Sequence, residues 1–136
     1  MQIEIFSLCD AATADFGKLS MLGAFDTLWV SKMPAVHPQC TIALRIGFKR
    51  IEKGEHKILV HFVDADGKNI ISPAQGGIAI NFPEDQSSCS ANLIFNIQSL
   101  KLEKLGEYSI DLAIDGQQKA SLPLFVKEHK IKKEGL

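Results

Sequence analysis

Two aspartates in the segment VDADGK, residues 63–68, have the type and spacing of possible metal ligands. Asp64 and Asp66 stand two positions apart before a glycine, and carboxylates at a strand end can bind Ca²⁺. An EF-hand also needs a glutamate at loop position 12, and Gln75 occupies that position. A β-turn explains the same residues, because Asp and Gly favour turn geometry. The turn is the preferred interpretation, and a Ca²⁺-dependent ligand- or lipid-binding β-sandwich is the alternative function.

Histidines and catalytic motifs give no further site. His56 and His61 have opposite parity on one predicted strand, so they point to opposite faces and cannot share a metal without a bulge. A partly buried, hydrogen-bonded role is expected for His61. The sequence contains no GxSxG, HExxH or CxxC motif, and no GK[ST] follows the paired glycines of AQGGIAI. We therefore expect no enzymatic activity, no metal and no cofactor; an active site assembled from distant residues such as Cys9, Asp10 and a histidine is the remaining alternative.

The three cysteines indicate the compartment. Cys9, Cys40 and Cys89 are odd in number and lie in apolar, strand-like segments, which favours buried reduced thiols over a disulfide framework. The N-terminal residues lack the basic region and the long apolar region of a signal peptide, and they are too polar for a transmembrane helix. The sequence therefore predicts a cytoplasmic protein without membrane contact.

Length and charge narrow the class of protein. The 136 residues fit one domain, residues 1–136, that can bury about 68% of its unfolded surface without a metal or disulfide. Lys and Arg number 15 against 16 Asp and Glu, so no strong positive field favours nucleic acid. No nucleic-acid partner is expected.

The apolar pattern has a period of two nearly throughout, which is typical of an all-β domain. Gly, Pro, Asn, Asp and Ser clusters interrupt it at short intervals, and no amphipathic helix is evident. Nine strands are predicted: residues 2–9, 18–30, 40–50, 56–63, 68–72, 77–82, 89–98, 107–114 and 119–126. So many short strands require two packed sheets or a closed barrel.

Tyr108, the only tyrosine, favours an immunoglobulin-like Greek-key β-sandwich. In such sandwiches a tyrosine near the start of the penultimate strand bonds the backbone a few residues upstream. The pattern LxxLGxY at residues 102–108 resembles this corner, with Gly106 supplying the permissive turn. The strands expected as B, C, E, F and G are residues 40–50, 56–63, 89–98, 107–114 and 119–126. Cys40 on strand B has no cysteine on strand F to bridge to, so the antibody disulfide is missing.

The predicted domain has three parts. Residues 40–126 form a seven-stranded sandwich, residues 1–35 an additional N-terminal strand pair, and residues 127–136 a solvated tail. The first 35 residues are strongly apolar and must therefore cover something.

Several segments together resemble a known family. FSLCDAATADFGKLSMLGAFD, MPAVHP, DADGK and GEYSIDLAIDGQQKASLPLFV are similar to segments of an uncharacterised family of small bacterial proteins, known only as a domain of unknown function. The resemblance implies a bacterial cytoplasmic origin and an immunoglobulin-like sandwich. No functional residue follows from it.

An apolar outer face on the predicted C, F, G sheet is the candidate interaction site. Strand parity places Leu59, His61, Val63, Ala113 and Phe125 on this face. An apolar face needs a lid or a partner, so the N-terminal residues either fold over it or leave it open. We expect an open face, with Pro123 marking strand G as an edge, and a non-enzymatic module that binds a protein partner or forms a homo-oligomer through this face or the loop 31–39.

Overall fold

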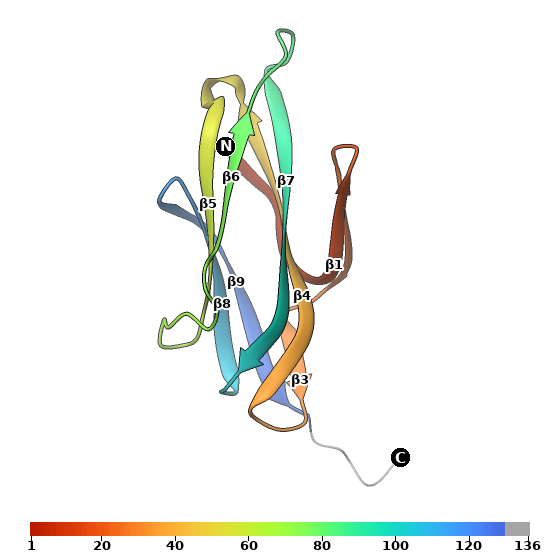
Figure 1. Cartoon of the computed structure of the whole chain (residues 1–136), viewed down its shortest axis with the longest axis vertical. Coiled ribbons are helices and arrows are strands. Elements are labelled where there is room, and N and C mark those ends of the chain that lie inside the picture. The colour runs from red at the N-terminus through yellow and green to blue at the C-terminus, as the bar shows by residue number, and fades with distance from the viewer. Residues whose placement is uncertain (130–136) are drawn as a thin grey trace.

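The computed structural model describes residues 1–129, which form two β-sheets packed face to face (Figure 1). Short turns and one 3-10 helix, η1 (Arg50–Glu52), connect the strands. The strands are β1 (Gln2–Asp15), β2 (Lys18–Ala24), β3 (Thr27–Val30), β4 (Ala35–Lys49), β5 (Gly54–Val63), β6 (Ala74–Ile80), β7 (Ser88–Leu102), β8 (Gly106–Ile114) and β9 (Gln117–Glu128).

The strand order is β2-β1-β4-β7 in one sheet and β3-β9-β8-β5-β6 in the other. From β4 onward the chain crosses between the sheets three times, from β4 to β5, from β6 to β7 and from β7 to β8, which is the Greek-key order of immunoglobulin-like domains. In that nomenclature β4, β5, β7, β8 and β9 are strands B, C, E, F and G. The predicted all-β, immunoglobulin-like sandwich is confirmed.

Alternate residues of the paired strands fill the space between the sheets. Even positions of β4, such as Leu44 and Ile46, are fully buried, and they face even positions of β5 and β8 such as Val60 and Leu112. The period of two in the sequence corresponds to this inward face. Fully burying each such side chain stabilises the fold by about 1.5–3 kcal/mol.

Tyr108 closes the corner before β8. Its side chain is 3% exposed, and its hydroxyl donates to the Lys104 carbonyl at 2.7 Å and accepts from the Lys104 amide at 3.2 Å. Gly106 has a φ of 121°, a left-handed conformation that few other residues adopt. The turn and the hydroxyl contact together hold the crossover between the two sheets.

The first 35 residues contain the predicted strand pair, β1 and β2, and they also contribute strands to both sheets. The first half of β1, residues 2–9, pairs with β4, and the second half pairs with β2. β3 pairs in parallel with the end of β9. The apolar residues of this segment therefore complete the sandwich. The strand expected at 18–30 is divided in two at Phe25 and Asp26, and residues 68–72 form only an isolated bridge to Val63.

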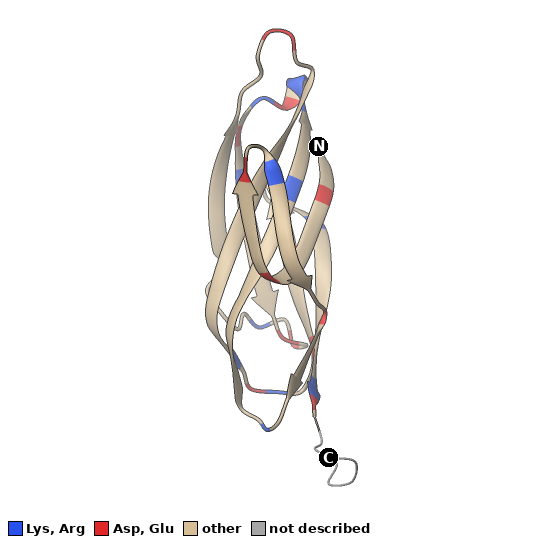
Figure 2. Ribbon diagram, turned by 90° about the vertical axis from the view of Figure 1, so that its right-hand side faces the viewer, with Lys and Arg blue, Asp and Glu red and all other residues tan. Residues whose placement is uncertain are grey.

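The second half of β1 and all of β2 form a hairpin arm, residues 10–24, that lies over the outer face of the four-stranded sheet (Figure 2). Arg45 on β4 donates to the carbonyl of Gly17 at the tip of the arm, at 3.0 Å. Cys9, Thr41 and Ala43 are fully buried, although Cys9 and Ala43 are not part of the core between the sheets. The arm therefore contributes to a small third layer.

The C-terminal end of the sandwich extends beyond the predicted boundary. Lys127 and Glu128 belong to β9 and pair with Trp29 and Val30, and the amide of His129 donates to the Val30 carbonyl at 2.7 Å. The expected solvated tail at 127–136 therefore begins at least three residues too early. Residues 130–136 of that prediction lie outside the described residues.

Candidate interaction surface

The five residues of the predicted interaction site lie on one face of the five-stranded sheet. Leu59, His61 and Val63 alternate along β5, Ala113 lies opposite Leu59 on β8, and Phe125 lies on β9. All five are half-buried, while their neighbours in each strand point into the core. We call this side of the β3-β9-β8-β5-β6 sheet the outer face.

The N-terminal segment leaves the outer face open. β1 belongs to the opposite sheet, the arm lies beyond that sheet, and β3 extends the five-stranded sheet along β9. β9 is therefore not an edge strand along its last four residues, contrary to the expectation based on Pro123. Pro123 precedes the segment paired with β3. It has no N–H to donate on the side of β9 where the Phe125 amide bonds the Asp26 carbonyl.

Pairing with β3 adds an aromatic side chain that strand parity on β5, β8 and β9 could not reveal. Trp29, the only tryptophan, is 61% exposed and lies opposite Lys127. The Lys127 ammonium is 5.6 Å from the Trp29 ring centroid and 5.9 Å from that of Phe125. Phe125, Lys127 and Trp29 thus form an aromatic and cationic cluster at one end of the outer face.

A polar band crosses the middle of the outer face. Asp111 lies opposite His61 on one side and Ser121 on the other. The hydroxyls of Ser109 and Ser121 both donate to Asp111 Oδ1, at 2.7 and 2.5 Å. His61 Nδ1 is 3.2 Å from Asn69 Oδ1. The face is therefore amphipathic instead of uniformly apolar.

A shallow apolar hollow lies beyond the polar band. It has a volume of about 500 Å³ and is lined by Leu59, Ala113 and the glycines Gly76 and Gly77 of β6. Gly77 has no side chain on this face, which leaves open space beside Leu59, whereas a side chain at Gly76 would point toward Leu93 and Phe95 between the sheets. The outer face thus offers two apolar areas, the hollow and the aromatic cluster.

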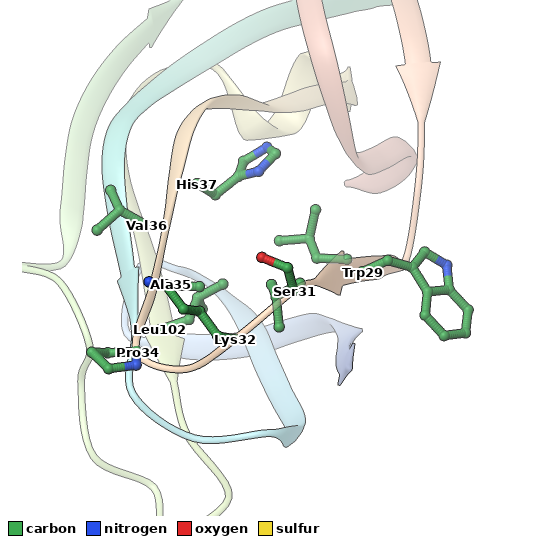
Figure 3. Close-up of a pocket in the computed structure, with 10 residues that line it drawn as sticks. Trp29, Ser31, Lys32, Pro34, Ala35, Val36, His37 and Leu102 are labelled. Carbon is green, nitrogen blue, oxygen red and sulfur yellow. The ribbon is translucent and has the colours of Figure 1, made fainter. Parts of the chain in front are cut away.

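A second pocket of about 350 Å³ lies beside residues 31–34, which join β3 to β4 (Figure 3). Only these four residues of the predicted loop 31–39 form a loop, because β4 begins at Ala35. Ser31, Val36, His37 and Leu102 contribute to its lining, while the Trp29 ring points away from it. His37 Nε2 is buried and has no hydrogen-bond partner among the described residues. This loop, one of the predicted docking segments, adjoins the outer face at Trp29.

The two aspartates of VDADGK have separate partners, Asp64 in its own turn and Asp66 on Lys104. Asp64 Oδ1 accepts the backbone amides of Asp66 and Lys68, at 2.9 and 3.0 Å, and these hydrogen bonds lower the pKa of Asp64. Asp66 Oδ2 is 3.2 Å from the Lys104 ammonium. Among residues 1–129, no cluster of three or more His, Cys, Asp or Glu side chains could hold a metal ion. No contact favours the Ca²⁺-dependent alternative.

Together these features define an immunoglobulin-like β-sandwich domain with one open, amphipathic sheet face. Residues 4–127 match the Family of unknown function (DUF6941), and the chain belongs to this family. The resemblance inferred from the sequence motifs is therefore confirmed. No curated protein matches the chain.

Solved structures resemble the chain in fold. A β-glucosidase from Listeria innocua in complex with gluconolactone superposes with a TM-score of 0.52 and 14% identity over 93% of this chain and 16% of the enzyme. The same enzyme with isofagomine gives 0.51 and 13% over 96% and 17%. The chain therefore spans about a sixth of these relatives, and the likeness concerns the fold alone. Within the described residues, no helix has the length and apolar character needed to cross a membrane.

Proposed function

We propose that this domain is a non-enzymatic protein-interaction module that docks a different protein on its outer face. The observation that carries the proposal is the aromatic and cationic cluster of Phe125, Lys127 and Trp29 on a sheet face that no segment of residues 1–129 covers. The three reduced cysteines expected from the sequence are compatible with a cytoplasmic adaptor.

The composition of the outer face supports a protein as its occupant. Tryptophan, other aromatic residues and a cation are enriched at the energetic centres of protein interfaces. Trp29 contributes nothing to the core at 61% exposure, so its apolar surface is available to a partner. The polar band around Asp111 keeps the face hydrated in the free domain, as expected for an interface that forms reversibly.

Affinity purification with matched baits tests the proposal. Wild type, Phe125→Glu and Ile51→Glu are used to capture proteins from the native host; Ile51 is 91% exposed on η1, away from the outer face. We expect a protein that binds wild type and Ile51→Glu but not Phe125→Glu. The purified partner should shift the Trp29 emission to shorter wavelength on titration. A partner that binds all three baits equally, or leaves the emission unchanged, would place the docking site elsewhere.

A further inference from the structure

β7 presents a long, regular free edge. Among the described residues it pairs with β4 alone, and the register is uninterrupted from Ser88 to Gln98. The backbone becomes irregular only at Ser99, which has a φ of 54°. β6 forms the corresponding edge of the other sheet, on the same side of the sandwich (Figure 1). A regular edge of this length is a template for pairing with another strand.

This edge lacks the usual protection against such pairing. Natural edge strands carry charged residues, prolines or bulges. Residues 88–98, SCSANLIFNIQ, contain no charge and no proline. Between Lys68 and Lys101 the only charged residues are Glu84 and Asp85, which lie in the turn before β7. β6 and the regular part of β7, residues 88–98, therefore carry no charged side chain.

The β4 register shows which backbone groups face outward. The amide of Arg50 donates to the Ser87 carbonyl at 3.0 Å, in the same register as the β4–β7 ladder. Antiparallel bonding alternates along a strand. The backbone N–H and C=O groups of odd β7 residues therefore bond β4, and those of even residues point to the free edge. Ile94 is the middle of the five even residues from Ser90 to Gln98, the part of the regular edge that can pair symmetrically before the irregular Ser99.

We infer that a second copy of this chain pairs with β7 in antiparallel fashion, on a two-fold axis at Ile94. The even residues, Ser90, Asn92, Ile94, Asn96 and Gln98, are nearly palindromic about this position. The axis places Ile94 opposite Ile94 of the second copy and Asn92 opposite its Asn96. About ten backbone hydrogen bonds would form, two for each of the five pairs.

The side chains suit this symmetric pairing. Asn92 and Asn96 use their amide oxygens within the chain, accepting from Arg45 and Thr41 at 2.9 Å each. Their amide nitrogens are left as donors toward a neighbour. On the inner face, Leu93 and Phe95 are only half-buried, and the axis brings Leu93 opposite Phe95 of the second copy. The second copy would thus extend the apolar core.

Self-complementarity favours a second copy over an unrelated strand. An isologous interface needs a patch that matches itself, and the palindromic, uncharged edge meets that condition. The aromatic and cationic cluster lies on β3 and β9, at the end of the five-stranded sheet farthest from β6, so the dimer leaves this part of the proposed partner site free.

Charge substitution at position 94 provides a sharp test by light scattering after size-exclusion chromatography. We expect wild type to be a dimer, Ile94→Lys and Ile94→Glu to be monomers, and their equimolar mixture to restore the dimer. The last result follows because position 94 lies opposite itself across the axis. Ile51→Lys serves as the matched control and should remain a dimer. A wild type that stays monomeric up to its highest soluble concentration, or a dimer that Ile94→Lys leaves intact, would overturn the inference.

Hydrogen exchange of the wild type tests the same inference without any substitution. The amides of Asn92, Ile94 and Asn96 should become protected as the protein concentration rises, while those of odd β7 residues are protected at all concentrations. Equal exchange of the even amides in dilute and concentrated protein would contradict the pairing. Loss of partner binding in Phe125→Glu with an intact dimer would separate this inference from the proposed function.

Discussion

His56 Nδ1 lies 2.7 Å from Asp115 Oδ2, which joins β5 to the turn between β8 and β9. The other ring nitrogen, Nε2, lies 2.6 Å from the carbonyl oxygen of Glu52, and the ring stacks on Phe48 with centroids 5.0 Å apart. An imidazole can donate from both nitrogens only when it is protonated. The hydrogen bond to Asp115 is the main cause that raises the pKa of His56, and it also lowers the pKa of Asp115.

We predict a stability contribution from this pair that is lost at alkaline pH. A raised pKa in the folded state means that the His56 contribution is full below the ordinary value of 6.5 and declines as pH rises through the folded value. The Asp115 contribution is present above its ordinary value of 3.8 and declines as pH falls through the lowered folded value. Urea denaturation of wild type and His56→Gln across pH measures the difference. If the difference in free energy of unfolding between wild type and His56→Gln does not shrink above neutral pH, His56 is neutral in the folded protein.

Tyr108→Phe should lower the free energy of unfolding by about 1–3 kcal/mol. The substitution removes both contacts of the hydroxyl and leaves the Lys104 carbonyl and amide without their partner at the corner. Chemical denaturation of the two proteins gives the difference directly. An unchanged midpoint would mean that water replaces the hydroxyl at no cost.

The three thiols should react at different rates. Cys9 and Cys40 are fully buried, and desolvation, followed by the nearby charges of Cys9 and Asp10, raises the pKa of Cys40 to about 11. Cys89 is half-buried near the start of β7. Ellman titration of unreduced native protein should therefore show one faster thiol, and denaturant should release three equivalents. Fewer than three in denaturant would indicate a disulfide and contradict the cytoplasmic prediction.

Phe16→Asn should stabilise the arm. Phe16 is fully exposed at the tip of the β1–β2 hairpin with a φ of 53°, and Gly17 follows with 72°. Asparagine before glycine is favoured in such two-residue turns, so a gain of about 0.5–1 kcal/mol is expected. This gain is measured as slower hydrogen exchange of the arm amides in Phe16→Asn than in wild type. Phe16→Ala lacks the side-chain amide that lets asparagine tolerate positive φ and should bring no comparable gain. Slower exchange in both variants would mean that the Phe16 ring itself is unfavourable.

Alternating apolar residues and the Tyr108 motif were sufficient to predict the sandwich and the strands B, C, E, F and G. These features are local, because a strand's inward face and its corner residues are close in sequence. Parity likewise placed Leu59 and Phe125 on one face of the sheet. The residues that determine the character of that face, Asp111 and Trp29, required the cross-strand register.

Pairing between segments far apart in the sequence explains why some strands and edges were not predicted. β1 changes at Cys9 from pairing with β4 to pairing with β2, and its continuation to Asp15 was not predicted because residues 10–15, DAATAD, show no apolar alternation. The parallel pairing of β3 with β9 joins residues about 100 positions apart, and no local pattern specifies it. The free edge of β7 is similarly a property of the sheet order, because its residues resemble those of any buried strand.

Thermal melting of Phe125→Glu tests the openness of the outer face most directly. The new carboxylate would lie opposite Glu107 but near the Lys127 ammonium, which offsets the repulsion. We predict a folded protein with a midpoint within about 3 °C of wild type, while the core control Phe62→Glu fails to fold. A midpoint lowered by more than about 10 °C would mean that the face is covered and would remove the structural basis for a docking surface.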